Sequence, residues 1–244
     1  MTDSKAEKSK FSVTKRNKAK RMRERASYDV DTVYELLDSA LICHIAYVID
    51  GQPYCTPTLF WRDGNHVYWH GSVGSKMIMA QAKQIDICLT ITFLDGLVLV
   101  RSAFHHAVNF RSAMLFGRAG VVDDPVEKKR AADALIENFL PGRNDQVIVP
   151  TAAEMKQATF MRMTIDEAVA KIRAKPASGE PVENRYQPVW AGDIIIENRI
   201  TRIIPCPELK PGIEPGPEVE AFKEGARLDT TLLAIRRGAA RTES

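Results

Sequence analysis

Residues 67–77 read VYWHGSVGSKM, and this stretch points to both a fold and a ligand. Its first residues favour a strand, its small residues a loop, and the segment from Ser75 onward a helix. The start of a helix presents free backbone N–H groups and a partial positive charge, which attract anions. Ser72 and Ser75 add hydroxyl donors, and Lys76 adds a positive charge. The stretch therefore suits a phosphate group, although a small-residue loop before a helix is more often a plain connection.

Two familiar phosphate motifs are absent from this stretch, since neither GxxxxGK[ST] nor GxGxxG fits it. A second polar stretch, residues 101–112, reads RSAFHHAVNFRS and contains Arg111, whose planar guanidinium binds phosphate in a bidentate way. The alternative is a polar strand end whose charges face water. His105 and His106 do not predict a metal site, because strand neighbours point to opposite sides and no Asp, Glu or Cys joins them at ligand spacing.

The segments on either side predict an antiparallel β structure. Asp50-Gly51, Asp63-Gly64 and Asp95-Gly96 each lie between β-rich runs, and Asp-Gly favours the positive φ angles of tight hairpin turns. Repeated hairpins are typical of a meander that closes into a barrel. The expected strands are residues 42–49, 53–62, 66–69, 85–93, 97–101, 109–122, 160–165 and 194–196. Flanking helices are expected at residues 30–39, 75–83, 125–140, 151–156, 166–174 and 218–237.

The two ends of the chain differ in composition from its middle. Ten Lys or Arg residues lie between Lys5 and Arg25, so residues 1–25 are expected to form a flexible basic arm. This arm is either a solvated leader or a contact for an anionic ligand, lipid or nucleic acid. No aromatic side chains are interleaved to stack bases, so nucleic acid is not a predicted partner. Residues 26–200 are expected to form one domain, and residues 201–244 a Pro-rich segment and C-terminal tail.

The overall composition is that of an ordinary globular protein. The 244 residues are 45% hydrophobic and 27% charged, with a net charge of +3. No apolar run is long enough to span a bilayer, and the N-terminus lacks the apolar core of a signal peptide. The four cysteines contain no CxxC pair, which argues against a disulfide framework or a zinc site. A cytoplasmic location without a membrane partner is expected.

The order and spacing of these motifs resemble the pyridoxamine 5′-phosphate oxidase-related, flavin-binding split-barrel family, nearest its nitroimidazole-resistance reductase branch. The likeness runs from Tyr28 to Gly192. It is carried by His-Gly-Ser and Ser-Lys within residues 70–76, by Asn-Phe-Arg-Ser at residues 109–112, and by Phe-Gly-Arg-Ala at residues 116–119. The resemblance implies a mainly β, single-domain split barrel with flanking helices. It also implies a homodimer that binds flavin mononucleotide (FMN) at the subunit interface.

The resemblance further implies roles for individual residues. Ser75 and Lys76 would hold the phosphate with Ser72 close by, and His70 would lie near the flavin. Trp190 would reach the flavin from the partner subunit. The isoalloxazine ring would lie along a strand and be bordered by a second polar stretch; the residues concerned are Thr56, Thr58, Leu59, Phe60, Asn109, Arg111 and Ser112.

The activity expected from this resemblance is an FMN-dependent, NAD(P)H-linked oxidoreductase that reduces a small acceptor such as a nitro-aromatic or a quinone. His70 is the candidate proton donor, and the alternative is a packed histidine that supports the loop. A true pyridoxamine-phosphate oxidase is not expected, because no His follows His106 to complete the Arg-x-His pattern near the C-terminus. Two other classes stay open: a non-catalytic flavin storage or sensing protein, and a haem-binding or haem-degrading split barrel. A deazaflavin is a further alternative to FMN.

Overall fold

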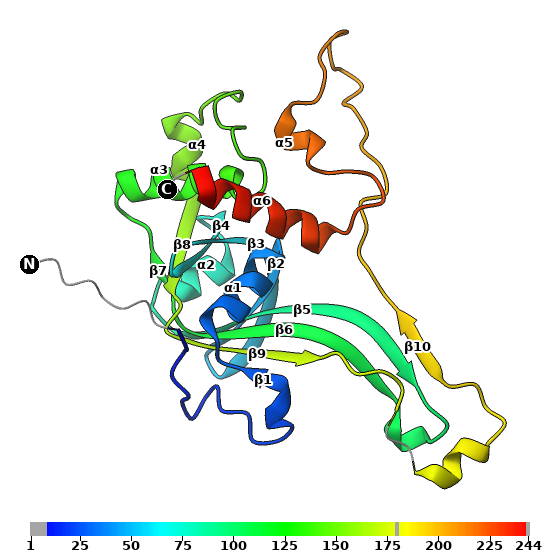
Figure 1. Ribbon diagram of the computed structural model, residues 1–244. Coiled ribbons are helices and arrows are strands. Elements are labelled where there is room, and N and C mark those ends of the chain that lie inside the picture. Colours follow the sequence, from blue (N-terminus) through cyan, green and yellow to red (C-terminus); the bar gives the residue numbers. More distant parts are fainter. Residues whose placement is uncertain (1–8, 179–180, 243–244) are drawn as a thin grey trace, which may run out of the picture.

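A strongly bent antiparallel sheet forms the body of the protein (Figure 1). The structure is a computed structural model and describes residues 9–178 and 181–242. Neighbouring strands follow the order β1-β9-β6-β5-β2-β3-β4-β8-β7, and β10 pairs with β5. The strands are β1 Ala26–Ser27, β2 Ile42–Ile49, β3 Gln52–Asp63, β4 His66–Ser72, β5 Asp86–Leu99, β6 Ala107–Arg118, β7 Gly120–Val121, β8 Ala158–Thr164, β9 Glu167–Arg173 and β10 Gly192–Ile195.

Short helices flank this sheet, in agreement with the prediction of a mainly β split barrel. They are α1 Val30–Asp38, α2 Lys76–Gln81, α3 Pro125–Glu137, α4 Ala152–Gln157, α5 Pro217–Glu220 and α6 Leu228–Thr242, with 3-10 turns η1 Arg23–Arg25, η2 Ala103–His105 and η3 Val182–Tyr186. Side chains cap the first turns of α1 and α4. Asp29 accepts the backbone N–H of Thr32 at 2.9 Å, and Thr151 with Glu154 forms a capping box. Among the described residues, none of the helices has the length and apolar character needed to cross a bilayer.

The barrel splits at β3 because that strand has two different partners. Its residues 52–59 pair with β2, whereas residues 60–63 pair with β4. The edge of residues 52–59 that faces away from β2 pairs with no other strand in the described part of the chain. Unpaired strand edges present backbone N–H and C=O groups. The split therefore leaves hydrogen-bonding groups exposed beside the loop that follows β4.

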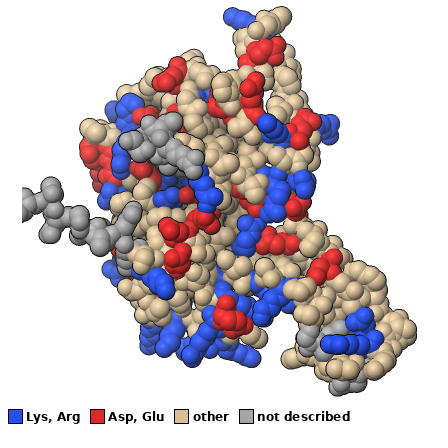
Figure 2. Space-filling view, in the orientation of Figure 1, with Lys and Arg blue, Asp and Glu red and all other residues tan. Residues whose placement is uncertain are grey.

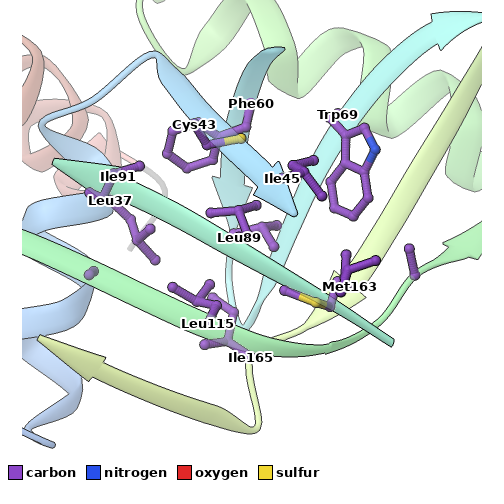
Figure 3. Close-up of a cluster of buried hydrophobic side chains, with 14 of the residues drawn as sticks. Leu37, Cys43, Ile45, Phe60, Trp69, Leu89, Ile91, Leu115, Met163 and Ile165 are labelled. Carbon is purple, nitrogen blue, oxygen red and sulfur yellow. The ribbon is translucent and has the colours of Figure 1, made fainter. Parts of the chain in front are cut away.

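The core lies inside the bend and follows the two-residue period of the strands. Along β2, Cys43, Ile45 and Tyr47 are buried, while the residues between them are exposed. Cys43 and Ile45 lie in one cluster with Leu89 of β5 and Leu115 of β6 (Figure 3). Each fully buried apolar side chain of this size contributes about 1.5–3 kcal/mol. The same cluster contains Trp69 of β4 and Met163 of β8, so strands from both sides of the split share one core.

Two elements differ from the sequence prediction. Asp95-Gly96 is not a hairpin turn, because β5 continues through it with one irregularity between Leu94 and Gly96. A Cβ at Gly96 would lie 2.7 Å from the carbonyl oxygen of Ile194, so this glycine permits the close passage of β10. Residues 166–174, predicted as a helix, form strand β9 instead. Pairing with β6 outweighs the local helix signal, since Ala168 and Ala170 fill the core.

Both ends of the chain contact the domain through a few buried residues. Phe11 and Asn17 are each only 4% exposed and anchor the described part of the predicted arm, whereas most other residues of 9–25 are exposed. Residues 1–8 of that predicted arm fall outside the described part. The single predicted C-terminal helix is interrupted, because α5 ends at Glu220 and α6 begins only at Leu228. Gly225, with a φ of 81°, lies in the turn between them. Helix α6 then packs across α1 (Figure 1).

An arm projects from the barrel and is visible at the lower right of Figure 1. It consists of the far ends of β5 and β6, the loop after β9, and β10. The turns η2 and η3 lie at its tip (Figure 1). The arm exists because β5 and β6 are 14 and 12 residues long, longer than the barrel requires.

Candidate functional site

The loop between β4 and α2 has the geometry of an open cradle. The Ser75 N–H donates to the Ser72 carbonyl oxygen at 2.9 Å, which turns the chain sharply before α2. A Cβ at Gly71 would lie 2.9 Å from Ile78 Cγ1, so glycine lets α2 pack close to β4. Gly74 has open space around it. The loop thus presents Ser72 and Lys76 to solvent on a fixed backbone.

Lys76 is aimed at the open edge of β3. Its Nζ donates to the Tyr54 hydroxyl at 2.6 Å and lies 4.1 Å from the centre of the Tyr54 ring. Tyr54 in turn stacks on Tyr47 with 5.6 Å between ring centres. No local motif in the sequence marks Tyr54. The hydrogen-bond partner of Lys76 is a hydroxyl rather than a carboxylate, which leaves the ammonium of Lys76 open to an anionic ligand.

The predicted residues of β3 divide between the two sides of the strand. Thr56 and Thr58 are half-buried on the side of Tyr54, and Thr56 shares a 3.1 Å hydrogen bond with the Tyr47 hydroxyl. Leu59 faces the opposite side, and Phe60 is fully buried in the core. The side chain of Phe60 therefore serves packing. The open backbone edge, rather than the side chains, is what residues 52–59 have in common.

His70 lies at the end of β4 among aromatic side chains. Its ring stacks on Phe160 with 5.5 Å between ring centres and lies 6.1 Å from Trp61. Burial lowers the pKa of His70 below its usual value, so the ring is neutral at neutral pH. Its Nδ1 is buried and has no hydrogen-bond partner within residues 9–178 and 181–242. An orphaned ring nitrogen of this kind calls for a ligand or an ordered water molecule.

Within one chain, the second predicted stretch, residues 101–112, lies away from the loop at residues 70–76. Arg111 donates to Asp95 at 2.8 Å and to Asp229 of α6 at 2.7 Å, so its guanidinium is already occupied by two carboxylates. Ser112 points to the other face of β6 and donates to the Lys171 carbonyl. Asn109 holds the end of β9 through the backbone of Lys175. Strand β6 lies three strands from β3, about 14 Å away at ordinary spacing.

Arg111 forms one wall of a cavity of about 280 Å³ at the open end of the barrel. Leu41, just before β2, and Phe93 of β5 line it, and Leu232 lines it from α6. Arg227 adds a second cation to this ion-pair network and contacts Asp229 at 2.8 Å. No sequence pattern predicts the network, because Arg111 and Asp229 are 118 residues apart. It attaches the C-terminal helix to the barrel.

The ion-pair network predicts a loss of stability in acid. Burial alone would raise the pKa of Asp229, but hydrogen bonds from Arg227 and Arg111 outweigh it and hold the pKa at about 2. A carboxylate with a depressed folded pKa stabilises the protein above its ordinary pKa. The stabilisation, up to about 2 kcal/mol, is lost as the pH falls from about 4 to about 2. Urea unfolding should therefore show Asp229→Asn less stable than wild type at neutral pH. The two should converge in this acid window, and a constant difference would contradict the assignment.

Trp190 lies in the loop before β10 and is 66% exposed. Its ring passes so close to Gly192 that a Cβ there would lie 2.7 Å from the ring. The arm carries this tryptophan away from the residue 70–76 loop of its own chain (Figure 1). The prediction that Trp190 reaches a partner's flavin stays a prediction.

Comparisons with known proteins identify the family. The sequence model of the family described as pyridoxamine 5′-phosphate oxidase matches residues 29–172, more than half of the chain. A search of curated proteins gave no match. The solved structure of the flavocytochrome Anf3 from Azotobacter vinelandii is 35% identical with a TM-score of 0.80, and the match covers 87% of this chain and 98% of that chain.

Two further solved structures are similar. The FAD and haem binding protein from Mycobacterium smegmatis is 28% identical with a TM-score of 0.77, over 84% of this chain and 98% of that chain. A protein described as a 5-nitroimidazole antibiotic resistance protein, from Bacteroides thetaiotaomicron, is 18% identical with a TM-score of 0.51, over 60% of this chain and 86% of that chain. The latter likeness shows the fold alone. The chain belongs to the pyridoxamine 5′-phosphate oxidase family.

Proposed function

We propose that this protein is a flavin-dependent redox protein that also binds haem, in other words a flavocytochrome. The observation that carries the proposal is the extent of the likeness to the flavocytochrome from Azotobacter vinelandii. It covers 87% of the chain at 35% identity, well beyond the family match at residues 29–172. Haem binding, an alternative to flavin binding in the sequence analysis, is therefore proposed in addition to flavin binding.

The loop at residues 70–76 and the open edge of β3 support the flavin half of the proposal. Ser72, Ser75 and Lys76 offer hydroxyl and ammonium donors suited to a phosphate. The unpaired backbone of residues 52–59 offers N–H and C=O groups suited to the polar edge of a flavin ring. His70 adds the orphaned ring nitrogen beside the loop. We propose FAD rather than the FMN predicted from the sequence, because of the likeness to the protein from Mycobacterium smegmatis.

The expected partner is a second copy of the chain. The outer face of β2 exposes Ile42 and Val48 at 54% and 53%, beside the exposed Cys55 and Pro57 of β3. A flat, largely apolar sheet face of this kind is typical of surfaces that are buried in assembly. A homodimer through this face would also bring the arm of one chain towards the other. Trp190 and Asn109, which lie far from the residue 70–76 loop of their own chain, could then reach the flavin of the partner chain.

A bound flavin supplies hydride and single-electron transfer, and a bound haem supplies single-electron or oxygen chemistry. The chain itself would fix the phosphate through Lys76 and exclude water from the β3 edge. His70 is neutral and carries one ring N–H, so it would hold a proton near that edge. A small acceptor such as a quinone or a nitro-aromatic stays the proposed substrate class. Steady-state NADH or NADPH oxidation with several acceptors separates this enzyme from a flavin store.

Cofactor content gives the direct test. Purified protein should show flavin absorption together with a Soret band, and acid should release FAD that mass spectrometry identifies. FMN in its place would restore the sequence prediction, and a deazaflavin would replace both. A colourless protein that takes up neither added flavin nor added haemin would contradict the proposal.

A further inference from the structure

The tip of the arm carries an unusual concentration of exposed apolar side chains. Phe104 is 91% exposed, Tyr186 84% and Trp190 66%, and Val182 and Val189 are also more than half exposed. Figure 2 shows this tip, at the lower right, as largely uncharged surface with one group of Lys and Arg. Large aromatic surfaces at the end of a projecting arm are poorly suited to water and well suited to a flat apolar ligand.

Two histidines lie in this apolar surface, at and just after the turn η2. The sequence predicted no metal site here on the assumption that they occupy a strand, but the chain turns at this point instead. His106 Nδ1 lies 3.1 Å from the carbonyl oxygen of Ser102, which can only accept a hydrogen bond. The proton of a neutral His106 ring is therefore on Nδ1. Nε2 keeps its lone pair, on an exposed side chain.

This arrangement matches that of histidines that bind metals. Such histidines usually donate one ring N–H to a backbone carbonyl, which fixes the tautomer and turns the other nitrogen towards the metal. His105 is less determined, because its Nδ1 lies 3.0 Å from the Ser102 hydroxyl, which either donates or accepts. Haem brings four nitrogen ligands of its own, so one histidine suffices to attach it.

The other histidines fit an axial ligand less well. The rings of Trp61 and Phe160 lie beside His70, and its Nδ1 is buried without a carbonyl partner to fix the tautomer. His66 is held near charged groups that include Arg162 and Asp63. His44 lies on the outer sheet face, where no aromatic surface comparable to the arm tip accompanies it among the described residues.

Positively charged side chains at the tip are suited to the propionate groups of haem. Haem has two propionate groups that bind cations. Lys175 and Arg185 are exposed in the loop between β9 and β10, close in sequence to Val182 and Tyr186. The tip thus combines an apolar surface, a nitrogen ligand and positive charge.

We infer that His106 is the axial ligand of the haem, with Nε2 bound to the iron and the aromatic tip of the arm against the macrocycle. The inference rests on the proposed function, since it names the residue that attaches the haem of the proposed flavocytochrome.

The test compares haem and flavin content in the same samples of wild type and His106→Ala, after growth with haem supply or reconstitution with haemin. Haem per chain, read from the Soret band and the pyridine haemochrome, should fall by about tenfold or more in the variant. Flavin per chain should stay unchanged. Added imidazole should restore the Soret band in His106→Gly, which a merely structural role of the side chain would not produce. His105→Ala is the matched control and should keep its haem. His70→Ala tests the competing ligand and should also keep its haem, whatever its effect on the flavin.

The outcomes distinguish a failure of the His106 assignment from a failure of the proposed flavocytochrome function. A wild-type protein that binds haem together with a His106→Ala variant that keeps an unshifted Soret band would overturn the inference and leave the flavocytochrome standing. Loss of haem from His70→Ala alone would overturn it in the same way. A His106→Gly variant that loses haem without recovery in imidazole would also count against ligation. A wild-type protein that takes up no haem would overturn the proposed function itself, and the ligand assignment with it.

Discussion

Lys76→Ala is expected to weaken flavin binding by about tenfold or more, which corresponds to roughly 1.5–3 kcal/mol for a charge-assisted contact. The Nζ of Lys76 donates to the hydroxyl of Tyr54, on β3, at 2.6 Å, which fixes the position of the ammonium. The substitution removes the charge from an exposed side chain, so the fold should be retained. Titration of the flavin-free protein with FAD and with FMN, followed by fluorescence quenching, measures the change.

Two controls make this result specific. Lys83→Ala removes an exposed lysine just after the same helix and should leave the affinity unchanged. Lys76→Arg keeps the positive charge and should retain part of the binding. An affinity that is the same in Lys76→Ala as in wild type would move the phosphate away from this loop. The flavin could then still bind elsewhere, so the cofactor test remains separate.

Asp38→Ala is expected to lower the free energy of unfolding by about 3–5 kcal/mol, because it removes the partner of two arginines. Asp38 accepts from Arg62 at 2.8 and 2.5 Å and from Arg236 of α6 at 3.0 Å. Arg236 is only 8% exposed, and burial lowers its pKa below the usual value. Without Asp38, this buried guanidinium would lose the one carboxylate that it contacts in the described part of the chain. Urea unfolding of the two proteins measures the difference.

The matched control is a carboxylate at the surface. Asp86 pairs with Arg118 at 3.0 Å, and both side chains are about two-thirds exposed. Asp86→Ala should therefore cost at most about 1 kcal/mol. If Asp38→Ala cost no more than Asp86→Ala, the packing of α6 on α1 would not depend on this ion pair.

The predictions that succeeded from sequence rest on short-range chemistry. Asp50-Gly51 and Asp63-Gly64 end their strands with tight turns because few residues tolerate positive φ, and Gly51 and Gly64 have φ of 79° and 54°. The same dipeptide at Asp95-Gly96 is misleading. There the glycine is required by the close passage of Ile194, which lies about a hundred residues further along the chain and leaves no local signal.

The candidate site divides in the same way. Lys76 could be chosen from sequence because strand, small-residue loop and helix follow one another directly, and the structure gives it an open edge to face. The same chemical argument predicts Arg111 as a phosphate-binding residue. Its guanidinium, however, already donates hydrogen bonds to Asp95 and Asp229. The competition between a ligand and an internal carboxylate for one guanidinium depends on distances that no motif encodes.

By itself, the sequence determined the barrel hairpins, the cradle at residues 70–76 and the family, because turn conformation and donor spacing are set by neighbouring residues. Only the tertiary structure decided which cation is available, where β3 loses its partner and where the two histidines of the arm point. Those features depend on β9, β10 and α6 packing against strands from earlier in the chain. Long-range packing buries or exposes a charged group irrespective of the motif in which it lies.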